Sequence, residues 1–185
     1  MRTIFLIGPK HSGKTSAGKA LAGHRCGSFI DLDEMIETRT GKSPRTLYKE
    51  GPEIFKKAET EALTALLHSE NVNNAMLIVA GGGGLIDNSE ALALLGAAGG
   101  KRSSAEGKFF LVYLEVSAET AWKRIKEAAE KSGELPPFLN TGNPEETHRA
   151  LHERRAAAYK ALADIVINAE NKRPSEIAGE IAEQC

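Results

Sequence analysis

Short apolar runs alternate with longer polar and amphipathic segments along the chain. A run that is apolar, β-branched and only a few residues long predicts a strand buried on both faces. Five such runs occur, at residues 3–7, 28–32, 76–80, 108–116 and 164–168. The last of them follows a long helical segment, and the first leads directly into a glycine-containing loop.

The segments between these runs predict helices. Helical spacing, caps and prolines at first-turn positions indicate helices at 14–22, 34–40, 43–48, 52–68, 90–95, from Ser117 onward through Trp122 and Arg124, at 144–163 and at 174–183. Strands that alternate with helices predict an α/β fold with an open parallel sheet between two helical layers. No internal repeat is visible, which excludes solenoids and propellers.

Composition and charge narrow the class of protein. The 185 residues are 41% hydrophobic and 26% charged, as in ordinary globular proteins. A formal net charge of −1 supplies no field for binding a polyanion, so neither nucleic acid nor a membrane surface is expected as the main partner. Cys26 and Cys185 fit no metal or redox spacing and are expected to be reduced thiols. Together with the lack of an early signal-like run, this predicts a cytoplasmic protein.

The most specific motif follows the first strand. Gly8-Pro9-Lys10-His11-Ser12-Gly13-Lys14-Thr15 has the spacing G-x-x-x-x-G-K-T between a strand and a helix. Its glycines let backbone amides point at phosphate oxygens, and the helix that follows adds its positive end. Lys14 is placed to reach the β- and γ-phosphates, and the Thr15 hydroxyl is placed to bind Mg²⁺. A chance match in a βα turn is the alternative, and His11 is expected to be only a loop residue.

Acidic residues close the second predicted strand. Asp31 and Asp33 lie two residues apart, so in an extended chain both side chains point the same way. One carboxylate can hold a water bound to Mg²⁺, and the other can accept a proton from an attacking hydroxyl. The alternative interpretation is the favourable acidic start of a helix.

Other residues are candidates with simpler alternatives. Four glycines, 81–84, follow the third strand and expose amides to a polar ligand, or form a flexible turn. In Phe55-Lys56-Lys57-Ala58-Glu59 a cation and a carboxylate lie one helical turn apart, which is often a surface pair. Of Arg149, Arg154 and Arg155, at least one is expected to face solvent. His148 and His152 have metal-site spacing but no third ligand, so a solvated face is expected.

Taken together and in their order along the chain, these motifs resemble those of shikimate kinase over essentially the whole chain. The features are the P-loop, F-I-D-L-D, F-K-K-x-E on a helix, a glycine triplet after a strand, a lid, and R-A-A-A-Y-K-x-x-A-D. The resemblance implies a three-layer P-loop kinase of the nucleoside-monophosphate-kinase type in one domain, 1–185. It also implies a substrate-binding region at about 33–67, a lid at about 126–143 and a surface insertion at about 96–107.

The resemblance implies a reaction and roles for individual residues. The γ-phosphoryl of ATP would pass to the 3-hydroxyl of shikimate, with Mg²⁺, in a monomer of the aromatic amino-acid pathway. Lys14 and Asp33 would be catalytic, and Thr15 and Asp31 would hold the metal. Nucleotide contacts would come from Gly8, Ser12, Gly13, Lys14, Thr15, Ser16 and, against adenine, Arg124. Substrate contacts would come from Asp33, Lys56, Gly82, Gly83, Gly84 and Arg155, with Glu59 orienting the cation on its own helix.

The chain departs from the family pattern at several positions. Lys56 stands where the family has arginine, and Pro136 in Pro136-Pro137-Phe138-Leu139 stands where a lid arginine reaches the phosphoryl group. Lys126 and Lys131 are candidate substitutes for that arginine. Gly81 replaces the usual Ser or Thr, and the P-loop lacks the family's additional glycine.

These departures leave two further hypotheses open. One is a related small-molecule kinase with a different hydroxylated acceptor. The other is a catalytically silent nucleotide-binding protein, against which the retained Lys14, Thr15, Asp31 and Asp33 speak.

Overall fold

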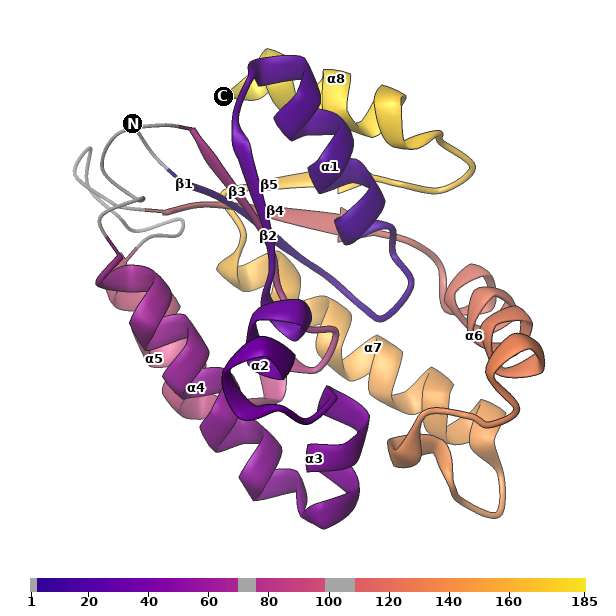
Figure 1. Cartoon of the computed structure of the whole chain (residues 1–185). Coiled ribbons are helices and arrows are strands. Elements are labelled where there is room, and N and C mark those ends of the chain that lie inside the picture. Colours follow the sequence, from indigo (N-terminus) through magenta and orange to yellow (C-terminus); the bar gives the residue numbers. More distant parts are fainter. Residues whose placement is uncertain (1–2, 70–75, 99–108) are drawn as a thin grey trace.

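A five-stranded parallel sheet forms the centre of the protein in a computed structural model that describes residues 3–69, 76–98 and 109–185. The strand order across the sheet is β2-β3-β1-β4-β5. Figure 1 shows the strands at the centre of the molecule, with helices above and below them. The strands are β1 (Thr3–Ile7), β2 (Ser28–Asp31), β3 (Leu77–Ala80), β4 (Phe109–Glu115) and β5 (Ile165–Asn168). The five predicted strands are therefore confirmed within one or two residues at their ends, except that Lys108 lies outside the described residues.

Helices connect these strands and begin where caps or first-turn prolines allow. They are α1 (Lys14–Arg25), α2 (Leu32–Thr40), α3 (Pro44–Glu50), α4 (Pro52–Leu67), α5 (Ser89–Ala98), α6 (Ala118–Ser132), α7 (Pro144–Leu162) and α8 (Pro174–Gln184). Ser117 caps α6 as predicted, since its hydroxyl accepts a hydrogen bond from the amide of Thr120. Short 3-10 turns, η2 (Leu85–Asp87) and η3 (Pro137–Leu139), follow the glycine run and α6.

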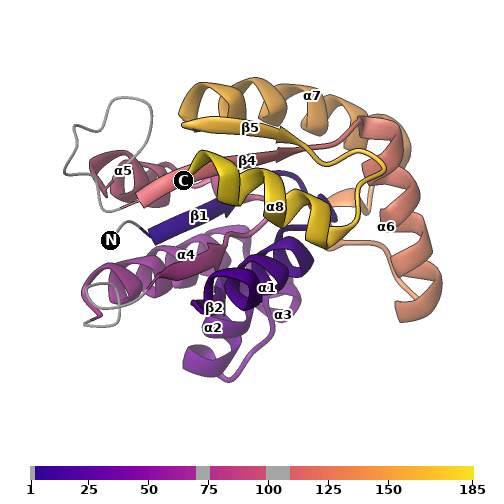
Figure 2. The same cartoon turned by 90° about the horizontal axis from the view of Figure 1, so that it is seen from above.

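Alternate residues of β1 divide the interior into two hydrophobic layers. Ile4 and Leu6 face α1, α6 and α8, whereas Phe5 and Ile7 face α2, α4, α5 and α7. Burial on both sides requires a strand that is apolar at every position, which is the pattern of β1. Figure 2 shows α1 and α8 together on one side of the sheet, and the three-layer α/β fold is confirmed.

Because the strands are parallel, their carboxyl ends lie along one edge of the sheet. The P-loop follows β1, Asp31 ends β2, the glycine run follows β3, and Ser117 follows β4. After β1 the chain first passes to β2 and β3 on one side of β1 and then crosses to β4 and β5 on the other side, and this change of direction opens a crevice at this edge. The topology thus brings together the motifs that the sequence analysis found far apart.

Helices α5 and α6 extend into segments that the sequence analysis assigned to the insertion and the lid. Helix α6 continues through Ser132, seven residues into the predicted lid, and stops at Gly133, whose φ of 80° suits glycine. Alanine, glutamate and lysine, which favour helix, fill this stretch and outweigh its polarity. Helix α5 includes Gly96–Ala98, the start of the predicted insertion; the rest of that insertion lies outside the described residues.

No helix among the described residues is long and apolar enough to cross a membrane.

Candidate active site

The P-loop wraps around the ammonium group of Lys14. This side chain is 8% exposed, and its ammonium donates hydrogen bonds to the carbonyls of Gly8 at 2.9 Å and Pro9 at 2.8 Å. Gly8 and Gly13 have φ of 144° and 97°, and a Cβ on Gly8 would lie 2.7 Å from the carbonyl oxygen of Leu114. Glycine is therefore required at Gly8 for space and at both positions for conformation.

His11 stands where the loop again needs a left-handed residue, with φ of 61°. Burial and the neighbouring cations Lys10, Lys14 and Arg124 lower the pKa of His11 to about 4, so its ring is neutral at physiological pH. The guanidinium of Arg124 donates to the His11 carbonyl at 2.9 Å, which ties α6 to the loop. The predicted contact of Arg124 with adenine stays a prediction.

Thr15 and Asp31 bring two side-chain oxygens together beside the loop. The Thr15 hydroxyl donates to Oδ2 of Asp31 at 2.6 Å. The other oxygen of Asp31, Oδ1, accepts a hydrogen bond from the amide of Asp33 at 3.0 Å. Asp31 therefore caps α2, and Asp33 lies in the first helical turn rather than in extended chain. The local structure is therefore the alternative interpretation, in which Asp31 and Asp33 form the acidic start of a helix. Both carboxylates nevertheless line the cavity around the P-loop.

Asp33 and Glu59 both approach Gly82 of the glycine run. A Cβ on Gly82 would lie 2.8 Å from Oε1 of Glu59 and 3.3 Å from Oδ1 of Asp33. Both oxygens are buried and have no hydrogen-bond partner among the described residues. Burial, followed by the nearby charge of Asp31, raises the pKa of Asp33, and burial raises the pKa of Glu59 to about 7. Two unsatisfied acceptors thus face the space beside a bare backbone.

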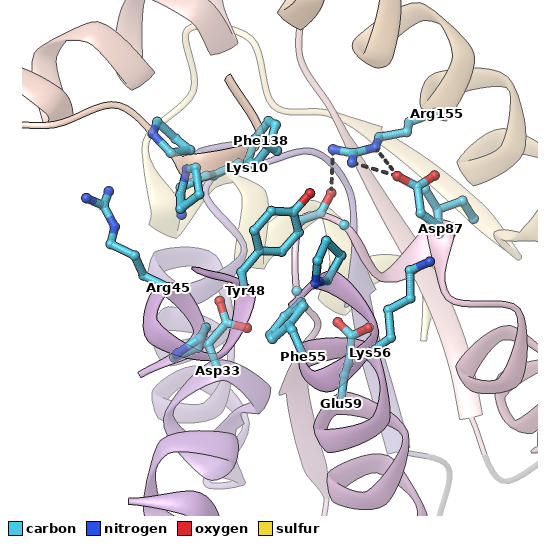
Figure 3. Close-up of a pocket in the computed structure, with 18 of the residues that line it drawn as sticks. Lys10, Asp33, Arg45, Tyr48, Phe55, Lys56, Glu59, Asp87, Phe138 and Arg155 are labelled. Atoms are coloured by element: carbon cyan, nitrogen blue, oxygen red, sulfur yellow. Dashed lines mark hydrogen bonds and ion pairs between the residues drawn. The ribbon is translucent and has the colours of Figure 1, made fainter. Parts of the chain in front are cut away.

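Arg155 is held in the crevice by Asp87. Its Nε and Nη2 both donate to Oδ2 of Asp87, at 2.9 and 2.6 Å, and its Nη1 donates to the Gly83 carbonyl at 3.5 Å (Figure 3). Arg154 forms an ion pair with the other oxygen of Asp87 at 2.9 Å. The Arg155 guanidinium is also 5.5 Å from the ring centre of Phe138. The Arg155 side chain is 13% exposed, so it presents a fixed, desolvated cation to the cavity.

Lys56 does not pair with Glu59, which corrects the expectation that Glu59 orients it. Its ammonium instead binds Glu53 at 2.9 Å, on the outer side of α4. Glu59 is 1% exposed and accepts a hydrogen bond from the side-chain amide of Asn88 at 3.0 Å. The two side chains point in different directions because one lies on the core face of α4 and the other at the rim. Lys56 still lines the cavity that contains Asp33 and Arg155.

Two cavities of similar size meet in the crevice. One of about 620 Å³ surrounds the P-loop and is lined by Lys14, Thr15, Ser16, Arg124 and Lys131 among others. The second, of about 610 Å³, lies between α3, α4, the glycine run and η3 (Figure 3). Its wall includes Arg45, Lys56, Glu59, Gly82, Gly84, Arg155 and the segment Pro136, Pro137 and Phe138. The structure therefore gathers the predicted nucleotide residues, except Gly8, around one cavity and the predicted substrate residues around the other.

The predicted lid, at about 126–143, contacts helix α3. Its residue Glu134 forms ion pairs with Arg45 and, at 3.0 Å, with Lys49, which tie this part of the predicted lid to α3. Of the two candidate substitutes for the lid arginine, Lys131 lines only the first cavity, and Lys126 lies 5.8 Å from the Trp122 ring centre and lines neither. Neither lysine faces the second cavity.

The histidine pair corrects another expectation. His148 and His152 are 6% and 9% exposed rather than solvated, because α7 packs them against Trp122, whose ring centre lies 5.5 Å from that of His148. His152 pairs with the Val116 carbonyl at 3.0 Å through Nε2. Arg149 and Arg154, in contrast, are mostly exposed, as expected for at least one of the three arginines.

Sequence reasoning missed several residues of the second cavity. Asp87 pairs with Arg155, while Asn88 both caps α5 and holds Glu59. Tyr159 is buried, and its hydroxyl donates to the Gly83 carbonyl at 3.1 Å. Their positions depend on contacts across 29 to 76 residues, which no local pattern encodes.

A P-loop beside a second cavity that contains charged side chains, with carboxylates at the boundary, defines a small-molecule kinase of the α/β P-loop class. A model of the shikimate kinase family matches residues 10–185. The shikimate kinase of Pseudomonas entomophila is 32% identical over 185 residues, covering 100% of this chain and 96% of the relative. That of Nitrosospira multiformis is 30% identical, covering 98% and 83%.

Solved structures agree with this match. A shikimate kinase from Acinetobacter baumannii in complex with shikimate superposes with a TM-score of 0.80 at 28% identity, covering 100% of this chain and 92% of the other. The chain belongs to the shikimate kinase family. It is a phosphotransferase with an alcohol acceptor and uses ATP as its co-substrate. The two other hypotheses, a changed acceptor and a silent protein, are not favoured.

Proposed function

We propose that this crevice transfers the γ-phosphoryl group of ATP to the 3-hydroxyl of shikimate, with the residues named above in distinct roles. One observation carries the proposal: a buried carboxylate oxygen of Asp33, which has no hydrogen-bond partner among the described residues, lies where the phosphate cavity meets the second cavity. An acceptor hydroxyl placed there would lie between a base and the phosphate-binding loop.

On the phosphate side, the loop amides and the amino-terminal end of α1 bind the triphosphate. Lys14 leaves the carbonyls of Gly8 and Pro9 for the β- and γ-phosphates. Burial lowers the pKa of Lys14 to about 8, against the opposing effect of Asp33. The lysine is still mostly protonated at neutral pH, and bound phosphate favours its charged form further.

The oxygen pair of Thr15 and Asp31 fits a magnesium ion bound together with ATP. Both are hard oxygen donors, 2.6 Å apart, beside the phosphate loop. No group of three or more acidic, histidine or cysteine side chains among the described residues could hold a metal alone, which suits an ion held mainly by phosphate and water. When bound, the ion neutralises phosphate charge; Thr15 and Asp31 would fix its position.

On the acceptor side, Asp33 accepts the hydroxyl proton as the new oxygen–phosphorus bond forms. The amides of Gly82, Gly83 and Gly84 approach the acceptor closely, because no side chain covers them. Arg155 binds the acceptor's carboxylate; Asp87 and Gly83 hold its guanidinium plane in place. Lys56 adds a second positive charge at the rim.

The lid segment shields the transfer from water. Pro136, Pro137 and Phe138 form an apolar wall on the second cavity, and Leu139 anchors the segment in the interior. Excluding water matters because water would compete with the acceptor hydroxyl for the phosphoryl group.

The substitution Asp33→Asn tests the assignment of the base. We expect turnover to fall about 10²- to 10⁴-fold, since general base catalysis contributes that much, while the dissociation constant for ATP changes little. Glu34→Gln is the matched control, because it removes a carboxylate from the next residue of α2, whose side chain is 69% exposed. Equal losses of turnover and ATP affinity in Asp33→Asn would refute the assignment.

We further propose a monomer in the cytoplasm. Among the described residues, the large apolar side chains that are exposed are Ile54 and Val166, which lie on different elements, so they give little area for an obligate interface. Cys26 and Cys185 are exposed free cysteines, a state that a reducing compartment maintains.

A further inference from the structure

One cation lies at the boundary between the two cavities. Among the described residues, three line both cavities: Lys10, Asp33 and Gly83. A phosphoryl group that leaves ATP in the first cavity and reaches an alcohol in the second has to pass between these three residues. Asp33 is the proposed base, Gly83 offers bare backbone, and Lys10 carries a positive charge.

The backbone of Lys10 is fixed by direct contact with the glycine run. A Cβ on Gly83 would lie 2.7 Å from the backbone nitrogen of Lys10 and 2.9 Å from its Cα, so the two chains touch. Gly83 is itself held, since its carbonyl accepts hydrogen bonds from Tyr159 at 3.1 Å and from Arg155 at 3.5 Å. The backbone of Lys10 is therefore positioned by the glycine run at the edge of the sheet.

Within the part of the chain that the structure describes, no partner neutralises the charge of Lys10. Its side chain is exposed, and its ammonium forms no hydrogen bond or ion pair with any residue in the described parts of the chain. Its charge nevertheless acts on the site, because it lowers the pKa of Lys14 and His11 and opposes the upward shift of the pKa of Asp33. The ammonium is thus within electrostatic range of the phosphate lysine and of the base.

Other cations near the site are placed differently. Lys131 lines the first cavity alone, and Arg155 lines the second alone and is bound to Asp87. The residues of η3 and its flank that face the second cavity are two prolines and Phe138, none of which carries charge. Charge that develops on the phosphoryl group during transfer is stabilised most by a cation already in place at that point.

We propose that Lys10 is a catalytic residue of this kinase and binds the γ-phosphoryl oxygens during transfer. The inference rests on the proposed function of the site. The acceptor oxygen forms a bond to the γ-phosphorus as the bond to the β–γ bridging oxygen breaks; that bond's electron pair leaves with ADP, and the acceptor proton goes to Asp33. Lys10 donates hydrogen bonds to the equatorial oxygens.

Lys10→Met tests this role, because methionine keeps the length of the side chain without its charge. We expect kcat for shikimate to fall about 100-fold or more, as when one donor is removed from a charge-stabilising site. Lys10→Arg should restore most of the rate. Binding supplies a readout independent of turnover: affinity for a non-hydrolysable ATP analogue should fall about tenfold, a loss of about 1.4 kcal/mol, while affinity for ADP stays within about twofold.

Lys123→Met is the matched control, since this exposed lysine of α6 lines neither cavity, and it should behave like the unaltered protein. A kcat of Lys10→Met within about threefold of the unaltered protein would overturn the proposal. Equal loss of affinity for ADP and for the analogue would also overturn it, because it would place Lys10 on the α- and β-phosphates. If the unaltered protein shows no shikimate-dependent turnover, the proposed function fails, and the difference between ADP and the analogue still decides the role of Lys10.

Discussion

The contact between the P-loop and the glycine run makes a prediction about stability. In Gly83→Ala, the new Cβ would lie 2.7, 2.9 and 3.1 Å from the backbone nitrogen, Cα and Cβ of Lys10. The first two of these atoms are backbone and cannot rotate away. The glycine run and the P-loop therefore have to separate by several tenths of an ångström.

The magnitude follows from two opposing effects. Forcing an extra methyl into a packed site costs about 1–3 kcal/mol. Replacing glycine by alanine also restricts the unfolded chain, which stabilises the folded state by about 0.4–1 kcal/mol. We therefore expect Gly83→Ala to lower the free energy of unfolding by about 1–2 kcal/mol, with a fall in Tm of about 2–4 °C for each kcal/mol in a chain of this size.

Chemical and thermal denaturation measure this effect, and the chain supplies a matched control one residue away. A Cβ on Gly84 would meet only Nη2 of Arg155, at 3.8 Å, and the φ of Gly84 is −109°, which alanine adopts. Gly84→Ala should keep the Tm of the unaltered protein or raise it slightly. If Gly83→Ala and Gly84→Ala have the same Tm and the same free energy of unfolding, the glycine run and the P-loop do not touch as described. The description of Lys10 and Gly83 as a shared boundary of the two cavities would then be wrong.

Three further predictions concern charges in the site. Because burial raises the pKa of Glu59 from 4.5 to about 7, the folded protein keeps a proton that the unfolded chain releases, so this contribution to stability is lost as pH rises from 4.5 to 7. Urea titrations should show that the free energy of unfolding of the unaltered protein falls by about 1–3 kcal/mol over that pH range relative to that of Glu59→Gln. A difference in unfolding free energy that stays constant with pH would refute the raised pKa of Glu59. Arg155→Lys should raise KM for shikimate about tenfold or more with little change in KM for ATP, since an ammonium lacks the bidentate fork; comparable changes in both would contradict the assignment. Removing Mg²⁺ with a chelator should abolish turnover reversibly, and undiminished turnover would exclude a metal at Thr15 and Asp31.

Local sequence patterns were sufficient to predict the fold. Continuous apolar runs such as Thr3–Ile7 signal strands buried on both faces, and prolines at the first positions of α3, α4, α7 and α8 mark where helices begin. The end of α6 was misjudged because polar composition does not distinguish a surface helix from a loop. Helix propensity and Gly133 determine where α6 stops.

The site was predictable to the extent that motifs lie at strand ends. Lys14, Thr15, Asp31 and the glycine run all follow strands whose carboxyl ends share one edge, so their convergence follows from the topology. Side-chain partners were not predictable in this way. Glu59 binds Asn88 instead of Lys56, because the choice depends on which face of α4 is buried and on a turn 29 residues away.

Direct observation of the product tests the central claim. The purified protein would be incubated with ATP, Mg²⁺ and shikimate, and phosphorus NMR would follow the phosphorylated species over time. The account predicts ADP and a shikimate phosphate monoester in equal amounts, with phosphate at the 3-hydroxyl. ADP formation no faster than in the absence of shikimate, or a different hydroxylated acid phosphorylated far more efficiently, would contradict it.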